Sequence, residues 1–458
     1  MSKVGSEQNP LRVAVIGSGP SGFYATEALI KSEYAVRIDM FERLPAPFGL
    51  VRNGVAPDHP KLKQSILVYD KIARSPEFTY LGNVTIGRDI SVDELRGAYH
   101  ASIFACGAET DKKLGIPGED LAGSHTATEF VGWYNGHPDY RDRVFDLSSE
   151  VAVIVGQGNV AADVCRILAK TVDELKHTDI AEHALAALAE SKIREIYVIG
   201  RRSPAQAKFT NKELRELGEL ADCAMIVNPQ DLSLNPESEK ELADKNNFIS
   251  AKNIEIFKSF TSSVLSKRRR CYIRFLEGPV AVMGNGRVEQ VVLERNRLEG
   301  PPFQQSARGT GEKVELPCGI LFRSIGYSGI PMPGVPFDER RGVFRNNDGR
   351  VVDHNGDVVP NLYVTGWIKR GPTGIIGTNR ADSVATVESL LADLPKLDSG
   401  EAKPGAASLY PLLASRGVRV ISYEDWLKID AAEVERGKLK NKPREKFTTV
   451  AEMLAVLS

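Results

Sequence analysis

Cysteine is scarce in this sequence. Among 458 residues there are five, namely Cys106, Cys165, Cys223, Cys271 and Cys318, and the closest two along the chain are Cys271 and Cys318. Zinc knuckles, local iron–sulfur ligand sets and redox dithiols place their cysteines a few residues apart, so this spacing excludes them as local motifs. An odd, sparse set is also atypical of a secreted disulfide scaffold. We therefore expect the protein to work in a reducing compartment.

Long apolar runs and an excess of charge are also absent. No stretch approaches the roughly 18 uncharged apolar residues that a membrane-spanning helix needs, and residues 1–10 contain neither an apolar core nor an arginine-rich presequence. The 59 basic and 60 acidic residues leave a formal charge of −1, which gives no general attraction for nucleic acid or anionic membranes. We expect a cytoplasmic protein, or one already processed, with no membrane insertion, no nucleic-acid partner and no metal site.

The sequence does contain two copies of a strand–helix–strand pattern. In each copy a short apolar run rich in β-branched residues ends in glycine, a helical pattern follows, and a second apolar run completes the unit. The first copy is expected at residues 11–17, 21–32 and 35–41, and the second at residues 151–156, 159–170 and 195–200. The pattern predicts an α/β protein with two Rossmann-like, doubly wound dinucleotide-binding domains.

Two further buried strands, expected at residues 99–107 and 319–326, are each followed by a polar or turn-rich crossing. These paired crossings indicate that the second domain is inserted into the first. We expect the first domain to comprise residues 1–108 and 330–458, and the inserted domain to comprise residues 109–329. A short tail module is expected from about residue 408, with a solvated lysine-rich run near its end.

The first glycine-rich turn reads Gly17-Ser18-Gly19-Pro20-Ser21-Gly22. Gly17 would make the tight turn, Gly19 would let the backbone approach a pyrophosphate, and Gly22 would let helix and strand pack closely. The helix that begins here would direct free N–H groups at the phosphates. Glu42 ends the second strand, where a carboxylate that binds a ribose diol belongs.

The second turn, Gly156-Gln157-Gly158-Asn159-Val160-Ala161, is the alanine variant of the same motif. Here Arg201 and Arg202 stand where an acid would bind the ribose, and guanidinium groups at this place favour a 2′-phosphate. One site therefore prefers a diol ribose and the other prefers NADP(H). Two such sites in one chain indicate a flavoprotein in which FAD takes a hydride from the nicotinamide.

Five segments together resemble one family. GSGPSG, PFGLVRNGVAPDHPK, GQGNVAAD, GRRSPAQAKFTNKELREL and GWIKRGPTGIIGTN resemble adrenodoxin-reductase-type ferredoxin–NADP+ reductases, including the bacterial NADPH-ferredoxin reductases. The resemblance covers nearly the whole chain and is weakest in residues 230–315 and in the tail. It implies that FAD contacts Ser21, Glu42, Leu50, Val84, Trp367, Gly374, Ile375 and Ile376. It also implies that NADP+ contacts Gln157, Gly158, Asn159, Val160, Arg201, Arg202, Glu213, Gly374 and Lys112.

The resemblance also places His59 and Glu216 near the flavin, which makes them the candidate catalytic pair. They would orient the nicotinamide or relay protons to the reduced flavin. The alternative for His59 is a hydrogen bond to a nearby backbone carbonyl. Trp367 has an alternative too, as an aromatic core residue.

The implied activity is that of an NADPH:ferredoxin oxidoreductase, in which electrons pass singly to a separate ferredoxin. A disulfide acceptor would require a cysteine pair near the flavin, and the sequence offers none. The alternatives are a flavin-dependent monooxygenase and an electron-delivery subunit of a larger complex. The basic run of residues 267–270 is a candidate docking site for an acidic ferredoxin, or a solvated hairpin end. We expect a monomer.

Overall fold

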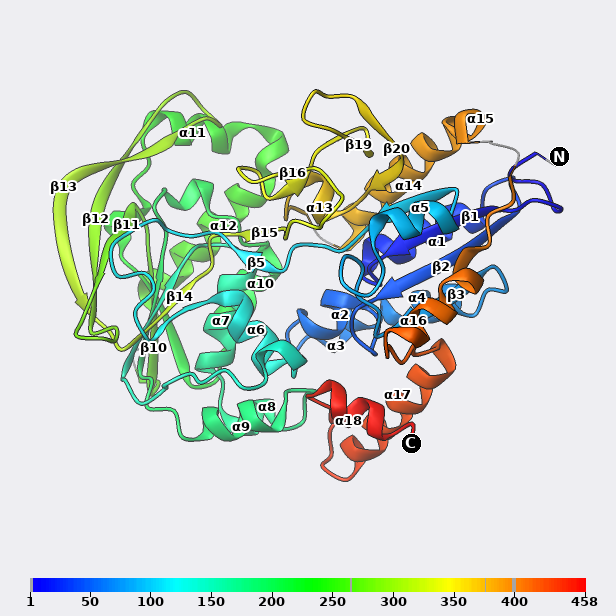
Figure 1. Ribbon diagram of the computed structural model, residues 1–458. Helices are drawn as coiled ribbons and strands as arrows, with labels where there is room; N and C mark the ends of the chain where they lie inside the picture. The colour runs from blue at the N-terminus through cyan, green and yellow to red at the C-terminus, as the bar shows by residue number, and fades with distance from the viewer. Residues whose placement is uncertain (1–2, 264–265, 375, 398–400) are drawn as a thin grey trace. The chain divides into compact units, whose positions relative to one another are not determined.

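The computed structural model describes residues 3–263, 266–374, 376–397 and 401–458. The chain divides into two compact units (Figure 1). Unit 1 comprises residues 1–110 and 326–458, and unit 2 comprises residues 111–325. Unit 2 is thus one uninterrupted stretch inserted into the chain of unit 1, and each unit contains its own sheet with helices. The expected α/β class with an inserted second dinucleotide-binding fold is confirmed.

Unit 1 is built on a seven-stranded sheet in the order β18-β19-β20-β4-β1-β2-β3. The five strands from β20 to β3 run parallel, and β18 and β19 add an antiparallel edge. The strands are β1 (Leu11–Ile16), β2 (Val36–Glu42), β3 (Phe78–Gly82), β4 (Ala101–Phe104), β18 (Asn346–Asn347), β19 (Arg350–Val352) and β20 (Val358–Val364). A small hairpin joins β16 (Phe337–Asp338) to β17 (Val343–Phe344).

Strand β1 is buried on both faces, which explains its continuous apolar sequence. Val13 and Val15 enter one hydrophobic cluster, while Ala14 and Ile16 enter another, because side chains alternate across a strand. Helices cover both faces of such a sheet. Those of unit 1 are α1 (Pro20–Ile30), α2 (Gly49–Asn53), α3 (Pro60–Lys63), α4 (Ile66–Ala73), α5 (Val92–Ala98), α13 (Trp367–Arg370), α14 (Ile376–Ala392), α15 (Leu394–Leu397), α16 (Tyr410–Ser415), α17 (Tyr423–Lys438) and α18 (Val450–Ala455).

The sequence predicts a helix that starts near Arg380. Helix α14 begins four residues earlier, at Ile376. Gly377 and Thr378 are weak helix formers and made this stretch resemble a loop. Ile376, however, packs against the hydrophobic core of unit 1. This tertiary contact outweighs the local preference.

The tail lies in unit 1. Trp426 and Ile429 of α17 lie in the same hydrophobic cluster as β1, and Met453 of α18 joins them. The lysine-rich run was expected to be solvated, but Lys442 and Lys446 are buried. The reason is that the chain folds back after α17, and its charges pair within the unit.

Unit 2 contains a six-stranded sheet of parallel strands in the order β6-β14-β7-β8-β10-β9, and a three-stranded antiparallel sheet β11-β12-β13. The strands are β6 (Ser124–Thr126), β7 (Val151–Val155), β8 (Glu195–Ile199), β9 (Cys223–Val227), β10 (Arg269–Arg274), β11 (Glu277–Met283), β12 (Gln290–Glu299), β13 (Ser306–Pro317) and β14 (Ile320–Arg323). The helices are α6 (Ala127–Tyr134), α7 (Asn159–Ala169), α8 (Val172–Leu175), α9 (Glu182–Ala189), α10 (Asn211–Gly218), α11 (Pro236–Ala243) and α12 (Phe248–Ser259).

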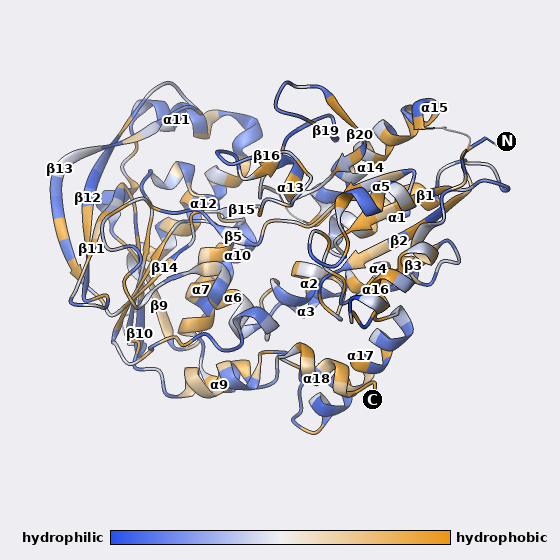
Figure 2. Ribbon diagram, in the orientation of Figure 1, coloured by the Kyte–Doolittle hydropathy of each residue, from blue (hydrophilic) through white to orange (hydrophobic). Residues whose placement is uncertain are grey.

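The two sheets of unit 2 differ in burial. Ala152 and Ile154 of β7 enter one core, and Val153 and Val155 enter the other, so this strand is covered on both faces. Strand β13 is largely exposed, and Figure 2 shows it mostly in the hydrophilic colours. Among the described residues, none of the helices has the length and apolar character that a membrane crossing requires.

Candidate functional site

The first glycine-rich turn has the backbone geometry that a phosphate-binding turn needs. Gly17 has φ +105°, and a Cβ at this position would lie 2.6 Å from the Ala105 carbonyl oxygen. A Cβ at Gly22 would lie 2.1 Å from the Gly17 carbonyl oxygen, so helix α1 and strand β1 pack too closely for any side chain. Gly19 is the N-cap of α1, and a Cβ there would meet open space. At Gly17 and Gly22 the turn therefore packs closely against backbone atoms, whereas at Gly19 it leaves open space that a ligand can approach.

Glu42 lies at the end of β2, beside this turn. Its Oε2 accepts hydrogen bonds from the Ser18 hydroxyl (2.6 Å) and the Ser18 N–H (3.2 Å), and its Oε1 accepts one from the Leu44 N–H (3.1 Å). Ser18 was not singled out from the sequence, although its position between two motif glycines is a usable signal. The carboxylate is thereby oriented by the turn itself, and its remaining lone pairs can accept from a ribose diol.

Trp367 lies just after β20, on a backbone turn that only glycine adopts easily. Gly366 has φ +76°, and a Cβ there would lie 2.2 Å from the Ser21 Oγ. The Gly366 N–H donates to the Asp382 carboxylate (2.6 Å), which α14 supplies. The Trp367 ring stacks on Tyr327 at 5.4 Å, and its indole Nε1 is buried without a hydrogen-bond partner among the described residues. A buried, unpaired donor at this place fits a bound cofactor that supplies an acceptor.

Asp382 was also missed by the sequence reasoning. It lies three residues beyond the segment GWIKRGPTGIIGTN, and the spacing in the sequence does not reveal that its carboxylate reaches back to residue 366. Lys369 pairs with the same carboxylate at 2.9 Å. Asp382 therefore fixes the turn that carries Trp367.

The other residues expected at the first nucleotide lie in three different places in unit 1. Val84 is buried, and its N–H donates to the Glu42 carbonyl (2.9 Å). Leu50 lies on α2 with 39% of its surface exposed. Gly374 is exposed with φ +83°, Ile376 begins α14, and Ile375 lies outside the described residues.

Helix α2, which carries Leu50, is held by a buried ion pair with the tail. The Arg52 guanidinium donates to both carboxylate oxygens of Glu433 in α17 (2.8 and 2.5 Å), and the two side chains are 4% and 0% exposed. The same carboxylate accepts from Arg444 (3.3 Å) and from the Phe447 N–H (3.0 Å). Burial opposes ionisation of Glu433, but the neighbouring guanidiniums outweigh it and hold the pKa of its carboxyl below the ordinary value.

His59 is the N-cap residue of α3, and 8% of its surface is exposed. Its backbone N–H donates to the Ala56 carbonyl (3.0 Å). The ring is thus placed by the Pro- and Gly-rich loop that precedes α3.

The second glycine-rich turn repeats the geometry of the first in unit 2. Gly156 has φ +132°, and a Cβ there would lie 2.0 Å from the Ser324 carbonyl oxygen. Gly158 caps α7, and a Cβ there would meet open space. The Gln157 side chain donates to the Arg274 carbonyl (2.9 Å), and the Asn159 side chain accepts from the Thr210 N–H (2.8 Å). Val160, the next residue of α7, packs against the core.

Arg201 and Arg202 follow β8 at the carboxyl edge of the same sheet. Arg201 is exposed and Arg202 is half-buried. Neither guanidinium forms an ion pair with any described residue, and burial together with the charge of Arg201 lowers the pKa of Arg202. The Glu241 carboxylate attracts Arg202 from a distance but does not pair with it directly. Two adjacent cations of this kind favour an anion, and a phosphate suits their fork geometry.

Glu213 and Glu216 lie one turn apart on α10, but they differ in environment. Glu213 is 7% exposed, and its Oε2 accepts from the buried Arg166 (3.2 Å). Glu216 is partly exposed and lies 3.5 Å from the Lys212 ammonium. Glu213 is thus an internal partner of an arginine, whereas Glu216 is accessible. Lys112 is exposed on a loop near the start of unit 2.

Two of the five cysteines meet in the core of unit 2. Cys165 of α7 and Cys271 of β10 have Sγ atoms 3.2 Å apart, although 106 positions separate them. Both are fully buried and both are free thiols. Burial raises the pKa of Cys271 well above its ordinary value, and burial likewise raises that of Cys106 in unit 1 to about 12. These thiols are poor nucleophiles at neutral pH.

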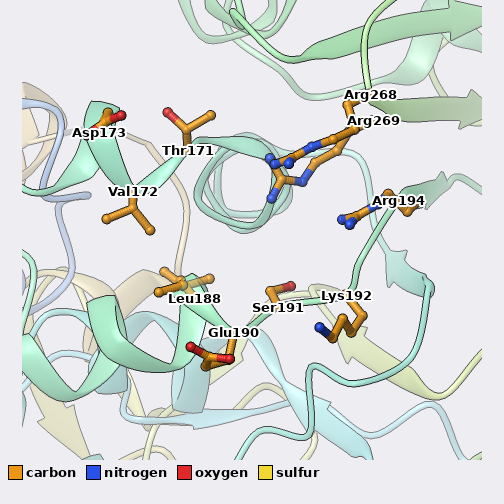
Figure 3. Close-up of a pocket in the computed structure, with 11 residues that line it drawn as sticks. Thr171, Val172, Asp173, Leu188, Glu190, Ser191, Lys192, Arg194, Arg268 and Arg269 are labelled. Atoms are coloured by element: carbon orange, nitrogen blue, oxygen red, sulfur yellow. The ribbon is translucent and has the colours of Figure 1, made fainter.

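A cavity of about 420 Å³ opens at the amino edge of the six-stranded sheet, opposite the edge that carries the glycine turn (Figure 3). Arg268 and Arg269 lie side by side there, and Arg194 lies near them on the adjacent strand end. Arg268 and Arg269 form their hydrogen bonds and ion pairs with other groups of unit 2. Arg269 is buried and donates to the carbonyls of Ile193 (3.3 Å) and Ala169 (3.2 Å), while Arg268 pairs with an aspartate at 3.0 Å.

This cavity therefore lies between strand ends whose arginines are already bonded to groups of unit 2. Lys267, at the head of the same basic run, donates to the Leu220 carbonyl. One expectation for residues 267–270 was a solvated hairpin end. The run instead leads into β10, which lies between β8 and β9 as an inner parallel strand. The cations of this run are largely bonded to carbonyls and carboxylates of unit 2.

Comparisons with known proteins agree with these observations. The chain is 43% identical to the mitochondrial NADPH:adrenodoxin oxidoreductase of Arabidopsis thaliana, over 98% of this chain and 96% of that protein. It is 41% identical to NADPH-ferredoxin reductase FprA of Mycobacterium tuberculosis, over 98% and 99%. The structure of M. tuberculosis FprA in complex with NADPH matches with a TM-score of 0.92 at 41% identity, covering 98% of this chain and 99% of that one. No family model matches the chain.

Proposed function

This chain belongs to the family of NADPH:adrenodoxin oxidoreductases and NADPH-ferredoxin reductases, and on that premise we propose that it is an FAD-dependent NADPH:ferredoxin oxidoreductase. The observation that carries the proposal is the contrast between its two glycine turns. Glu42 stands beside the first turn, and Arg201 and Arg202, which pair directly with none of the residues that the structure describes, stand beyond the second. A diol-selective site and a 2′-phosphate-selective site in one chain suit FAD and NADPH, respectively.

Unit 1 is the FAD-binding part and unit 2 the NADP-binding part of this proposal. In unit 1, Gly19 leaves room for a pyrophosphate, Glu42 accepts from the ribose, and the unpaired Trp367 indole N–H donates to the ring system. In unit 2, the Gly156–Val160 turn receives the second pyrophosphate. Leu50, Val84, Gly374, Ile375 and Ile376 complete the first site, and Glu213 and Lys112 complete the second.

Bound FAD supplies the ability to accept a hydride from NADPH and to release electrons one at a time to an iron–sulfur protein. The protein's own contribution is alignment. Asp382 fixes the Gly366–Trp367 turn by accepting from the Gly366 N–H. His59 and Glu216 orient the nicotinamide and hold a proton near the reacting rings. Hydride transfer requires no side-chain base, so we expect neither residue to be indispensable.

The electron acceptor is a separate ferredoxin. Support comes from the thiols, because the close pair Cys165 and Cys271 is fully buried and cannot exchange with a disulfide substrate. The enzyme works as a monomer in the cytoplasm, where free thiols such as these are kept reduced.

The test is reconstitution with purified protein. A flavin spectrum, reduction by NADPH and ferredoxin-dependent reduction of cytochrome c are expected together. Protein without bound flavin would refute the assignment. NADPH-dependent hydroxylation of a substrate without ferredoxin would favour a monooxygenase instead, and activity that appears only in a larger assembly would favour an electron-delivery subunit.

A further inference from the structure

Helices α3 and α4 of unit 1 carry a cluster of exposed hydrophobic side chains. Leu62, Leu67 and Val68 are 40%, 72% and 44% exposed. The opposite face of α4 is buried, and there Tyr69 stacks on Phe23 of α1 at 4.9 Å. The helix is thus anchored by one face and presents apolar side chains to solvent with the other. Exposed apolar patches of this kind mark interaction surfaces.

Lysines flank these apolar side chains along the same two helices. Residues 60–71 contain Lys61, Lys63 and Lys71 but only one acidic residue, Asp70. The Asp70 carboxylate already accepts from Arg74 (2.8 and 3.0 Å) and from a tyrosine hydroxyl (2.7 Å). Lys61 and Lys71 form no ion pair with any described residue, so their charges remain available. The patch is basic at its rim, although the whole chain carries a net charge of −1.

The position of this patch in the chain is also informative. Helix α3 begins at Pro60, directly after His59, and α2 with Leu50 lies a few residues earlier. The proposed function assigns Leu50 to the flavin site and His59 to the nicotinamide that reacts with the flavin. A one-electron acceptor has to dock close to the flavin. The other basic run, residues 267–270, has its cations bonded to carbonyls and carboxylates of unit 2.

We propose that α3 and α4 form the docking surface for the ferredoxin, with Leu62, Leu67 and Val68 as its apolar centre and Lys61 and Lys71 as its basic rim. The partner is an acidic iron–sulfur protein with a complementary apolar spot. This inference rests on the proposed reductase function. The apolar centre would supply most of the binding energy, while the lysines would set orientation and association rate in a salt-dependent manner.

The experiment compares two pairs of matched variants of the full-length holoenzyme. K61E/K71E is paired with K258E/K313E, which changes the net charge equally at exposed lysines of unit 2. Leu67→Gln is paired with Leu439→Gln, because Leu439 is 81% exposed in the tail. Purified [2Fe–2S] and [4Fe–4S] ferredoxins are screened with the wild type, and the fastest is used to measure the ferredoxin KM by cytochrome c reduction. NADPH-dependent ferricyanide reduction needs no docking and serves as the internal control.

We expect K61E/K71E and Leu67→Gln each to raise the ferredoxin KM at least fivefold at low salt, with ferricyanide reduction within twofold of the wild type. K61E/K71E should also flatten the salt dependence of the KM. Ferredoxin constants equal to those of the matched controls would overturn the docking surface. A parallel loss of ferricyanide reduction would overturn it too, because the residues would then act on the flavin. A wild type that reduces ferricyanide but no ferredoxin would instead refute the proposed function.

Discussion

The buried ion pair between Arg52 and Glu433 gives the sharpest stability prediction. Glu433→Gln keeps the shape of the side chain but removes its charge. The guanidinium of Arg52, only 4% exposed, then loses its carboxylate, and the Phe447 N–H and Arg444 lose part of a charge-assisted acceptor. Breaking a buried pair by removing one partner costs about 3–5 kcal/mol. Glu433→Gln can still accept hydrogen bonds, so we expect the lower end, about 3 kcal/mol.

For a folding unit of this size, a change of 1 kcal/mol shifts Tm by about 2–4 °C. Glu433→Gln should therefore lower Tm by roughly 6–12 °C, measured by calorimetry on the holoenzyme at pH 7. Glu435→Gln is the matched control, because Glu435 lies on the same helix, is 66% exposed and pairs with an exposed lysine. That surface pair should contribute less than about 1 kcal/mol.

The same pair predicts a pH dependence. The folded-state pKa of Glu433 is lowered, so its stabilisation is present above the unfolded-state pKa, near 4.5, and is lost as the pH falls through the folded-state value. The stability difference between wild type and Glu433→Gln should shrink accordingly in acid. A difference below 0.5 kcal/mol at pH 7, or one equal to that of Glu435→Gln, would refute the reasoning.

Three other predictions concern separate residues. Replacing Arg201 and Arg202 by alanine should raise the KM for NADPH at least tenfold, since charge-assisted hydrogen bonds are each worth about 1.5–3 kcal/mol, and equal losses with NADH would contradict the 2′-phosphate role. Burial raises the pKa of Asp111 to about 6, so the stability of the wild type falls as the pH rises from about 4 through 6. In urea unfolding, Asp111→Asn should therefore be more stable than the wild type at pH 7 but not at pH 4. Cys165→Ala should leave NADPH–ferricyanide activity within twofold, whereas its loss would point to thiol chemistry.

Local patterns in the sequence were sufficient for the sheets and the glycine turns. The runs around Val13 and Val153 are continuously apolar because both faces of these strands are covered, and glycine is required at Gly17 and Gly156 because a Cβ would strike a carbonyl. Such constraints act within a few residues, so they can be read directly along the chain. The start of α14 was misjudged, because there a distant core contact outweighs local propensity.

The sequence by itself determined the fold class, the two nucleotide turns and the contrast between Glu42 and the arginine pair. Only the tertiary structure decided that Glu433 in the tail pairs with Arg52, that Asp382 holds Gly366, and that two cysteines far apart in sequence lie 3.2 Å from each other. The physical reason is the distance along the chain over which each constraint acts. Backbone sterics and side-chain alternation repeat over a few residues, whereas ion pairs and thiol contacts depend on which distant segments share a core.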